Sequence, residues 1–185
     1  MVAGLLKFKE YFKDYADSYV LIGGAACDIL FTENEADFRA TRDLDIVLIV
    51  EALTPEFAGI FWDFIKDGDY YQVLLNGRVI ENGFSVLRPE YLILFKAKAY
   101  LDLSSRKAQG EKVDSANIKK HKKDVLRLAV EMVLNPVSDL PESVMEDIHH
   151  FINNLREDEY DQNSLKAYRV TNDQVVSRLV SVFEA

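Results

Sequence analysis

The spacing of apolar and polar positions predicts a β-containing first half of the chain. Apolar residues recur at helical spacing across residues 5–15, which predicts an amphipathic first helix. The apolar run at 19–22 then predicts a short buried strand. It ends at Gly23 and Gly24, where the chain is expected to turn into a short helix over 25–31.

The middle of the chain combines strand, helix and turn signals. The β-branched, nearly all-apolar run at 44–50 is typical of a central strand, and a proline in the first turn favours a helix over 54–65. The dipeptide Asn76-Gly77 between two apolar runs is a strong hairpin signal. These patterns predict further strands at 70–75, 78–80 and 84–87.

The second half carries only helical patterns. Helices are expected at 89–103, 115–134 and 141–156, and a last helix is expected to end near Phe183. Thr171 and Gln174 have the spacing of a capping box before that last helix. The element order predicts an α+β fold, with a small mixed sheet and flanking helices in residues 1–88 and a helical region in residues 89–185.

Composition supports a folded domain and narrows the partners. The chain has 185 residues, of which 49% are hydrophobic and 29% charged, and a formal charge of −9, which disfavours broad nucleic-acid binding. The single cysteine, Cys27, lies in an apolar stretch and is expected to be a buried thiol. No window has the length of a membrane span, so we expect a cytoplasmic protein without a membrane partner.

Two aspartates at the start of the apolar strand are the strongest candidate chemistry. Asp43 and Asp45 are two residues apart, so on a strand their side chains share one face with Cα atoms about 6.5–7 Å apart. Carboxylates in that arrangement suit a hard cation such as magnesium, which also removes their mutual repulsion. The alternative is that Asp43 caps a loop and Asp45 is a solvated residue at a strand end, but a charge beside the six apolar residues of the predicted strand needs a partner.

The glycine pair is the second candidate element. A Gly-Gly turn between a strand and a helix lets the backbone approach a phosphate, and the amides of the following helix face the anion. A tight turn with no ligand is the alternative for Gly23 and Gly24 taken alone.

The order strand, Gly-Gly, helix, loop, Asp-Leu-Asp, strand resembles the polymerase-β-like nucleotidyltransferase superfamily. The closer similarity is to its abortive-infection-toxin branch of bacterial nucleotidyltransferases. The similarity covers roughly residues 19–130 and is carried by four blocks: Leu-Ile-Gly-Gly-Ala-Ala at 21–26, Arg-Ala-Thr-Arg-Asp-Leu-Asp-Ile at 39–46, Leu-Ile-Leu-Phe-Lys-Ala-Lys-Ala at 92–99, and Lys-Asp-Val-Leu-Arg-Leu at 123–128.

This resemblance implies roles for residues in each block. Gly23 and Gly24 would contact the triphosphate, and Asp43 and Asp45 would bind Mg²⁺. The resemblance also implies that Thr41 and Arg42 support the metal loop or a phosphate. Lys96 would reach towards the nucleotide phosphates, and Asp124 would act near the acceptor or orient Lys96. For Lys96 and Asp124, ordinary solvated helix positions are the alternative.

One feature of the superfamily is missing from its expected place. Its members normally supply a third acid from a later strand of the same sheet, whereas here the candidates between residues 65 and 89 are Asp69 and Glu81. Glu81 is a candidate, although Asn82-Gly83 beside it is typical of a turn. Either the protein is a weakened or inactive member, or a stretch is missing near residues 66–71, which the mass of the intact chain would decide.

The expected activity is magnesium-dependent transfer of a nucleoside monophosphate from a nucleoside triphosphate to an acceptor hydroxyl on RNA, a protein or a small molecule. A nucleotide- or partner-binding module without catalysis, with a cognate antitoxin or a second copy of the chain as partner, is the alternative. A helical interaction protein is a third. The basic run Lys119–Lys123 around His121 is a candidate for contact with RNA or a nucleotide. Because Glu111, Asp114 and Asp124 surround it, a solvated helix face is the favoured interpretation.

Overall fold

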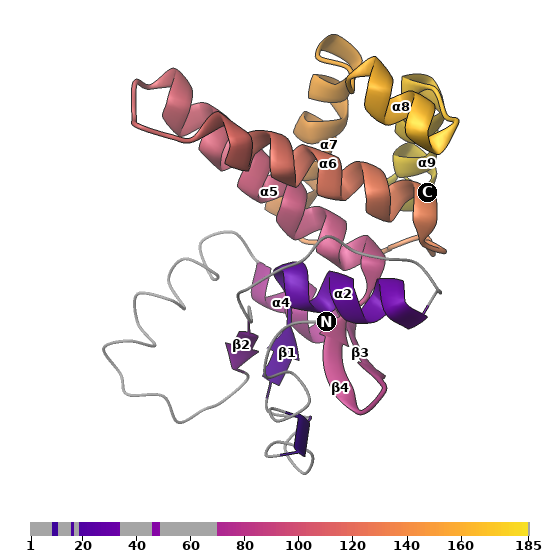
Figure 1. Cartoon of the computed structure of the whole chain (residues 1–185). Coiled ribbons are helices and arrows are strands. Elements are labelled where there is room, and N and C mark those ends of the chain that lie inside the picture. The colour runs from indigo at the N-terminus through magenta and orange to yellow at the C-terminus, as the bar shows by residue number, and fades with distance from the viewer. Residues whose placement is uncertain (1–8, 11–15, 17–18, 34–45, 49–69, 185) are drawn as a thin grey trace. The chain divides into compact units, whose positions relative to one another are not determined.

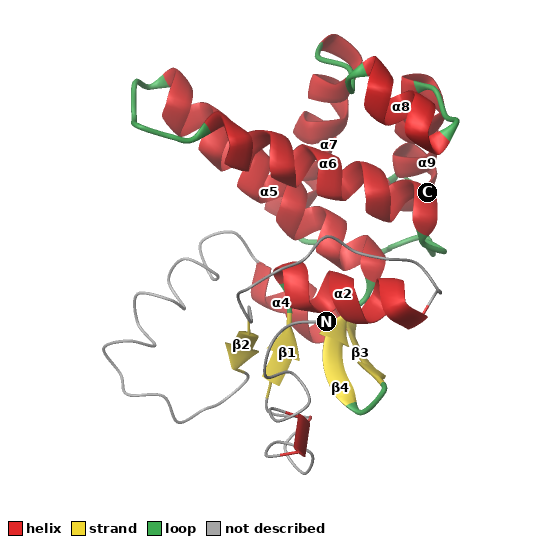
Figure 2. Ribbon diagram, viewed as in Figure 1, coloured by secondary structure: helices red, strands yellow, loops and turns green. Residues whose placement is uncertain are grey.

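The structure is a computed structural model that describes residues 9–10, 16, 19–33, 46–48 and 70–184 (Figure 1). The chain divides into two units between Leu92 and Ile93. Strands occur in the first unit, while the second is built from helices (Figure 2). The expected α+β class is confirmed, and each unit is described separately below.

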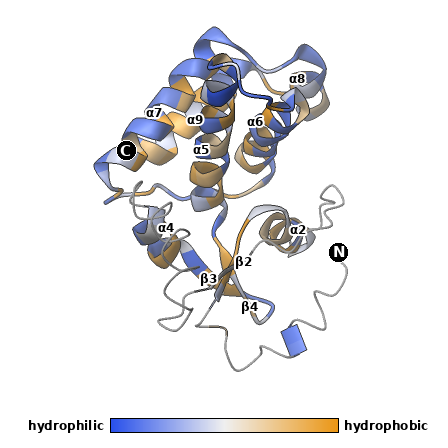
Figure 3. Ribbon diagram, turned by 90° about the vertical axis from the view of Figure 1, so that its left-hand side faces the viewer, coloured by the Kyte–Doolittle hydropathy of each residue, from blue (hydrophilic) through white to orange (hydrophobic). Residues whose placement is uncertain are grey.

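The first unit is organised around a four-stranded mixed sheet. Its strand order is β2-β1-β4-β3, where β1 pairs antiparallel with β2 and parallel with β4, and β4 pairs antiparallel with β3. Figure 3 shows α2 and α4 on either side of the strands. The elements are β1 (Tyr19–Leu21), α2 (Gly23–Glu33), β2 (Ile46–Leu48), α4 (Tyr70–Gly77), β3 (Arg78–Glu81) and β4 (Phe84–Leu87).

Several predictions for this unit are confirmed. The apolar run at 19–22 gives β1, the chain turns into α2 at Gly23, and β2 lies within the apolar run at 44–50. Cys27 is a buried thiol in α2. The helix expected over 54–65, most of the one over 5–15, and residues 66–69 lie outside the described residues.

The hairpin predicted at Asn76-Gly77 is wrong. Residues Tyr70–Gly77 form the helix α4, which packs through buried Tyr70, Val73 and Leu74. The glycine at position 77 is required by packing: a Cβ there would lie 2.4 Å from Cγ of Tyr91. The dipeptide therefore marks a close approach between two segments of the unit, and its turn signal is misleading.

The actual hairpin joins β3 and β4 through Asn82 and Gly83. Both turn residues have positive φ, at 50° and 72°, which is the conformation of a two-residue type I′ turn. Every residue of β4 is buried, and the ladder runs from the pair Arg78 and Leu87 to the pair Glu81 and Phe84.

The second unit contains a helical core. The boundary between the units falls inside α5 (Pro89–Ala108), which is followed by α6 (Ser115–Glu131), α7 (Glu142–Glu157), α8 (Gln162–Tyr168) and α9 (Asn172–Phe183). Figure 3 shows hydrophobic and hydrophilic sides on helices such as α7. Buried side chains from α6, α7 and α9 form the core, among them Leu126, Phe151, Leu155, Leu179 and Phe183.

The cap of the last helix in this unit follows its sequence signal, and the unit contains one helix that the sequence pattern did not predict. Thr171 and Gln174 form the predicted capping box at α9. The short helix α8 was not predicted; Asp161 caps it by accepting from the amide of Ser164, and Leu165 buries its apolar side. Among the helices of the described ranges, none combines the length and apolar character needed to cross a bilayer.

Candidate functional site

The diglycine turn has the backbone geometry that a glycine allows. Gly23 adopts a φ of 63°, in the left-handed region where an L side chain is strained. The amide of Ala26 bonds the carbonyl of Ile22 at 3.4 Å, which closes the first turn of α2. The strand β1 therefore runs directly into a helix N-terminus, a place where backbone amides and the helix dipole favour an anion.

The register of β2 fixes which end of the sheet adjoins this turn. Leu21, the last residue of β1, pairs with Ile46, the first residue of β2. Because the two strands are antiparallel, the chain enters β2 at the same end of the ladder at which β1 leaves for Gly23. Asp45 directly precedes Ile46 in the sequence.

Four of the expected site residues lie outside the described residues. These are Thr41, Arg42, Asp43 and Asp45. No group of three or more His, Cys, Asp or Glu side chains arranged for a metal occurs in the part of the chain that the structure describes. The roles of these four residues stay predictions.

Glu81 is wrong as a third acid for this end of the sheet. It pairs with Phe84, while the opposite end of β4 lies beside β1 through the pair Leu21 and Val86. Since β1 and β4 are parallel, Glu81 lies at the end where β1 begins, away from the turn at Gly23. The one polar residue of β4 is Ser85, whose buried hydroxyl has no hydrogen-bond partner among the described residues.

A buried carboxylate that was not among the sequence candidates lies near the Gly23 end of the sheet. Glu90 follows β4 by three residues, in the first turn of α5, and its side chain is 1% exposed. Arg88 lies 3.5 Å from it, but neither carboxylate oxygen accepts a hydrogen bond within the described ranges. An acid in the first turn of a helix is ordinary in sequence, so only its burial and the lack of hydrogen bonds to its carboxylate oxygens distinguish it.

Lys96 and Asp124 form an ion pair in the second unit. The ammonium of Lys96 on α5 lies 3.0 Å from Oδ2 of Asp124 on α6, and the side chains are 7% and 3% exposed. The alternative of two solvated helix positions is therefore wrong. The roles that the resemblance implies for Lys96 and Asp124 in nucleotide binding and catalysis stay predictions.

The basic run on α6 divides into exposed and buried lysines. Lys119, Lys120 and Lys123 are exposed, as expected for a solvated face. Lys122 is buried, and its ammonium donates to the backbone carbonyls of Asp158 and Glu159 and to the Asp158 carboxylate. The expectation fails at Lys122, because its position on α6 faces the loop between α7 and α8.

Comparisons of the chain with models of known protein families, with curated proteins and with solved structures find no match.

Proposed function

We propose that the chain is a magnesium-dependent nucleotidyltransferase whose triphosphate site is formed at the Gly23 end of the sheet. The observation that supports this most directly is the pairing of Leu21 with Ile46. It brings the entry to β2, which Asp45 precedes, to the same end of the sheet as the left-handed turn at Gly23. A phosphate-binding backbone and a pair of carboxylates at one sheet end are the two parts that such a site requires.

The reaction needs little covalent chemistry from the protein. An acceptor oxygen forms a bond to the α-phosphorus of the triphosphate, the bond from that phosphorus to the bridging oxygen breaks, and pyrophosphate leaves. The hydroxyl proton passes to a base. Magnesium held by Asp43 and Asp45 would supply neutralisation of the phosphate charge; the glycine turn and helix α2 would orient the phosphates.

Glu90 is the proposed third acid. It lies at the end of the sheet that the Gly23 turn shares, and its buried oxygens are without hydrogen-bond partners in the described part of the chain. A buried carboxylate whose oxygens accept no hydrogen bond is suited to complete a cation site. This arrangement would replace the strand acid of the superfamily with one from the first turn of a helix.

The test compares triphosphate binding in two matched variants of the full chain. Asp43→Asn/Asp45→Asn removes the proposed magnesium ligands, while Asp102→Asn/Asp139→Asn makes the same charge change at two exposed positions. With magnesium and each of ATP, GTP, CTP and UTP, we expect thermal stabilisation of the parent and the control, and none of the first variant. Equal stabilisation of all three proteins would show that the aspartates hold no metal–nucleotide complex.

A module that binds nucleotide without transferring it is the second candidate. The observation that favours it is the composition of the two later strands, in which the described residues place no acid at the Gly23 end. Transfer of label from α-labelled triphosphates to components of a cell extract separates the candidates. An active parent and an inactive Glu90→Gln variant that still binds nucleotide support the enzyme with Glu90 as its third acid. A parent that binds but never transfers supports the module.

A further inference from the structure

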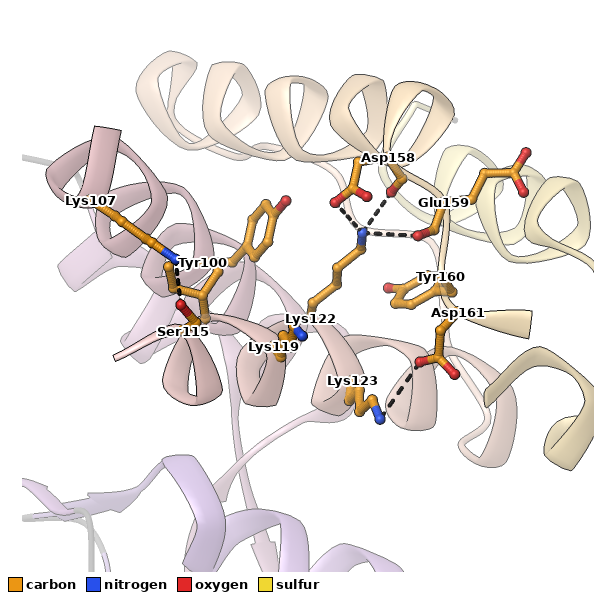
Figure 4. Close-up of a pocket in the computed structure, with 11 residues that line it drawn as sticks. Tyr100, Lys107, Ser115, Lys119, Lys122, Lys123, Asp158, Glu159, Tyr160 and Asp161 are labelled. Atoms are coloured by element: carbon orange, nitrogen blue, oxygen red, sulfur yellow. Dashed lines mark hydrogen bonds and ion pairs between the residues drawn. The ribbon is translucent and has the colours of Figure 1, made fainter. Parts of the chain in front are cut away.

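A cavity in the second unit gathers the lysines that the proposed function does not use. It measures about 550 Å³ and lies between α5, α6 and the loop that joins α7 to α8. Figure 4 shows the lysine side chains of α6 entering it from one side. Its lining includes Lys107, Lys119, Lys122 and Lys123 together with Tyr100 and Tyr160.

Two of these lysines already have carboxylate partners. Lys122 extends between the two tyrosines to Asp158, with Nζ and Oδ2 2.7 Å apart, and Lys123 lies 3.6 Å from Asp161 (Figure 4). Asp161 is also engaged as the cap of α8, and its hydrogen bonds from Ser164 lower the pKa of its carboxyl. The carboxylates of Asp158 and Asp161 are therefore engaged by Lys122, Lys123 and the N-terminus of α8.

The other two lysines have no carboxylate within ion-pair distance among the described residues. Lys107 donates a hydrogen bond to the hydroxyl of Ser115, and Lys119 lies one helical turn beyond Ser115 on the same face of α6. Glu159, the remaining acid of the lining, directs its carboxylate away from them in Figure 4. Asp114 caps α6 by accepting from the amide of Ala116, so the positive charge here comes from side chains and not from the helix end.

The hydroxyl of Tyr160 supplies an independent sign of a ligand. Its ring is 3% exposed and its oxygen has no hydrogen-bond partner within the described ranges. Figure 4 shows that oxygen directed into the cavity, towards Lys122 and Tyr100. Burial raises the pKa of Tyr160, so the group stays a hydroxyl and can donate to an anion. A buried hydroxyl without a partner is uncommon and indicates a group that the protein alone does not supply.

We propose that this cavity is a phosphate-binding site in which Lys107, Lys119 and Ser115 hold the anion and Tyr160 donates to a polar atom of the same ligand. A phosphate offers several acceptor oxygens to ammonium and hydroxyl donors, which is the set that this end of the cavity presents. The site lies wholly in the second unit and does not depend on the triphosphate site at Gly23.

The test follows the backbone amides of the isotope-labelled full chain by NMR during titration with tripolyphosphate. We expect shifts at residues 115–119 and at Tyr160, with a dissociation constant of about 1 mM or tighter. Lys107→Gln/Lys119→Gln should weaken this binding at least tenfold, whereas Lys120→Gln/Lys166→Gln should leave it within twofold, because it removes the same charge from exposed positions outside the cavity. Tyr160→Phe should weaken the binding of ATP, a phosphate ligand with further polar atoms, severalfold without altering the fold.

The source of the phosphate is distinguished by two further probes, ATP and a labelled single-stranded RNA decamer. If both ATP and the RNA decamer displace tripolyphosphate, the ligand is a polymeric phosphate. If only ATP displaces it, the ligand is a free nucleotide. Equal weakening in both double variants would mean general charge attraction and would overturn the proposal, as would the absence of shifts at residues 115–119. Shifts at Gly23 and Gly24 report the other site, so the two proposals fail separately.

Discussion

Two of the lysine–aspartate ion pairs to which helix α6 contributes differ strongly in the exposure of the acid. In the first pair, Lys96 and Asp124 are 3.0 Å apart and 7% and 3% exposed. In the second, Lys122 and Asp158 are 2.7 Å apart, but the side chains are 11% and 73% exposed. The shorter pair is the one that water reaches, so distance alone does not rank their importance.

The comparison shows that solvation decides what each pair contributes. Loss of Asp124 would leave the ammonium of Lys96 buried and without a carboxylate, and such a charge costs several kcal/mol. Loss of Asp158's charge would leave Lys122 with its hydrogen bonds to two backbone carbonyls. Lys96 therefore depends on a single carboxylate, whereas Lys122 keeps other hydrogen bonds when the Asp158 charge is removed.

The largest expected effect comes from Asp124→Asn. We expect the free energy of unfolding to fall by about 3–5 kcal/mol, because Lys96 becomes an uncompensated buried charge. Urea denaturation at neutral pH, followed by circular dichroism, measures the change.

A double variant tests whether the buried charge is the cause. Lys96→Met/Asp124→Leu removes both charges and keeps apolar volume, so its stability should return to within about 1–2 kcal/mol of the parent. If Asp124→Asn costs less than about 1 kcal/mol, water or another group compensates Lys96 and the distinction between the two pairs is lost.

A smaller loss is expected for Lys122→Met. The variant keeps the apolar stem but removes three hydrogen bonds to residues 158 and 159 and the contact of the ammonium with the rings of Tyr100 and Tyr160. We expect destabilisation of about 1–3 kcal/mol. Relative to the parent, hydrogen exchange of the variant should accelerate more in α8 than in α6, which would locate the loss at the loop between α7 and α8. Equal acceleration in both helices would contradict this assignment.

The smallest effect is expected for Asp158→Asn. The side chain is 73% exposed, so replacing its charge should change the free energy of unfolding by about 1 kcal/mol or less. The same denaturation series measures it. A loss as large as that of Asp124→Asn would show that the exposure of the acid does not control the strength of these pairs.

Predictability from sequence depends on whether a signal is local. The capping box at Thr171 and Gln174 and the apolar runs of β1 and β2 are local, and the structure follows them. The two Asn-Gly dipeptides show the limit of such signals. Asn82-Gly83 forms a turn, whereas Gly77 is set by the ring of Tyr91, fourteen positions later, which no window around residue 77 contains.

The candidate site shows the same limit. The turn at Gly23 is predictable because a glycine after an apolar strand indicates a backbone turn with positive φ. Lys122 and Glu90 are buried by segments that fold against them from elsewhere in the chain, so local sequence does not predict their burial. The pairing of Lys96 with Asp124 was suggested by family resemblance and not by spacing, since 28 positions separate them.

The contact at Gly77 has a consequence for mutational libraries of this protein. An added methyl group would lie 2.4 Å from Cγ, 2.6 Å from Cδ1 and 2.7 Å from Cβ of Tyr91, and the last of these atoms is held by the backbone of α5. Rotation of the ring cannot relieve that overlap, so in a saturation library at codon 77 functional clones should retain glycine. A compensating smaller residue at codon 91 would restore space only by opening a void where the phenol now packs.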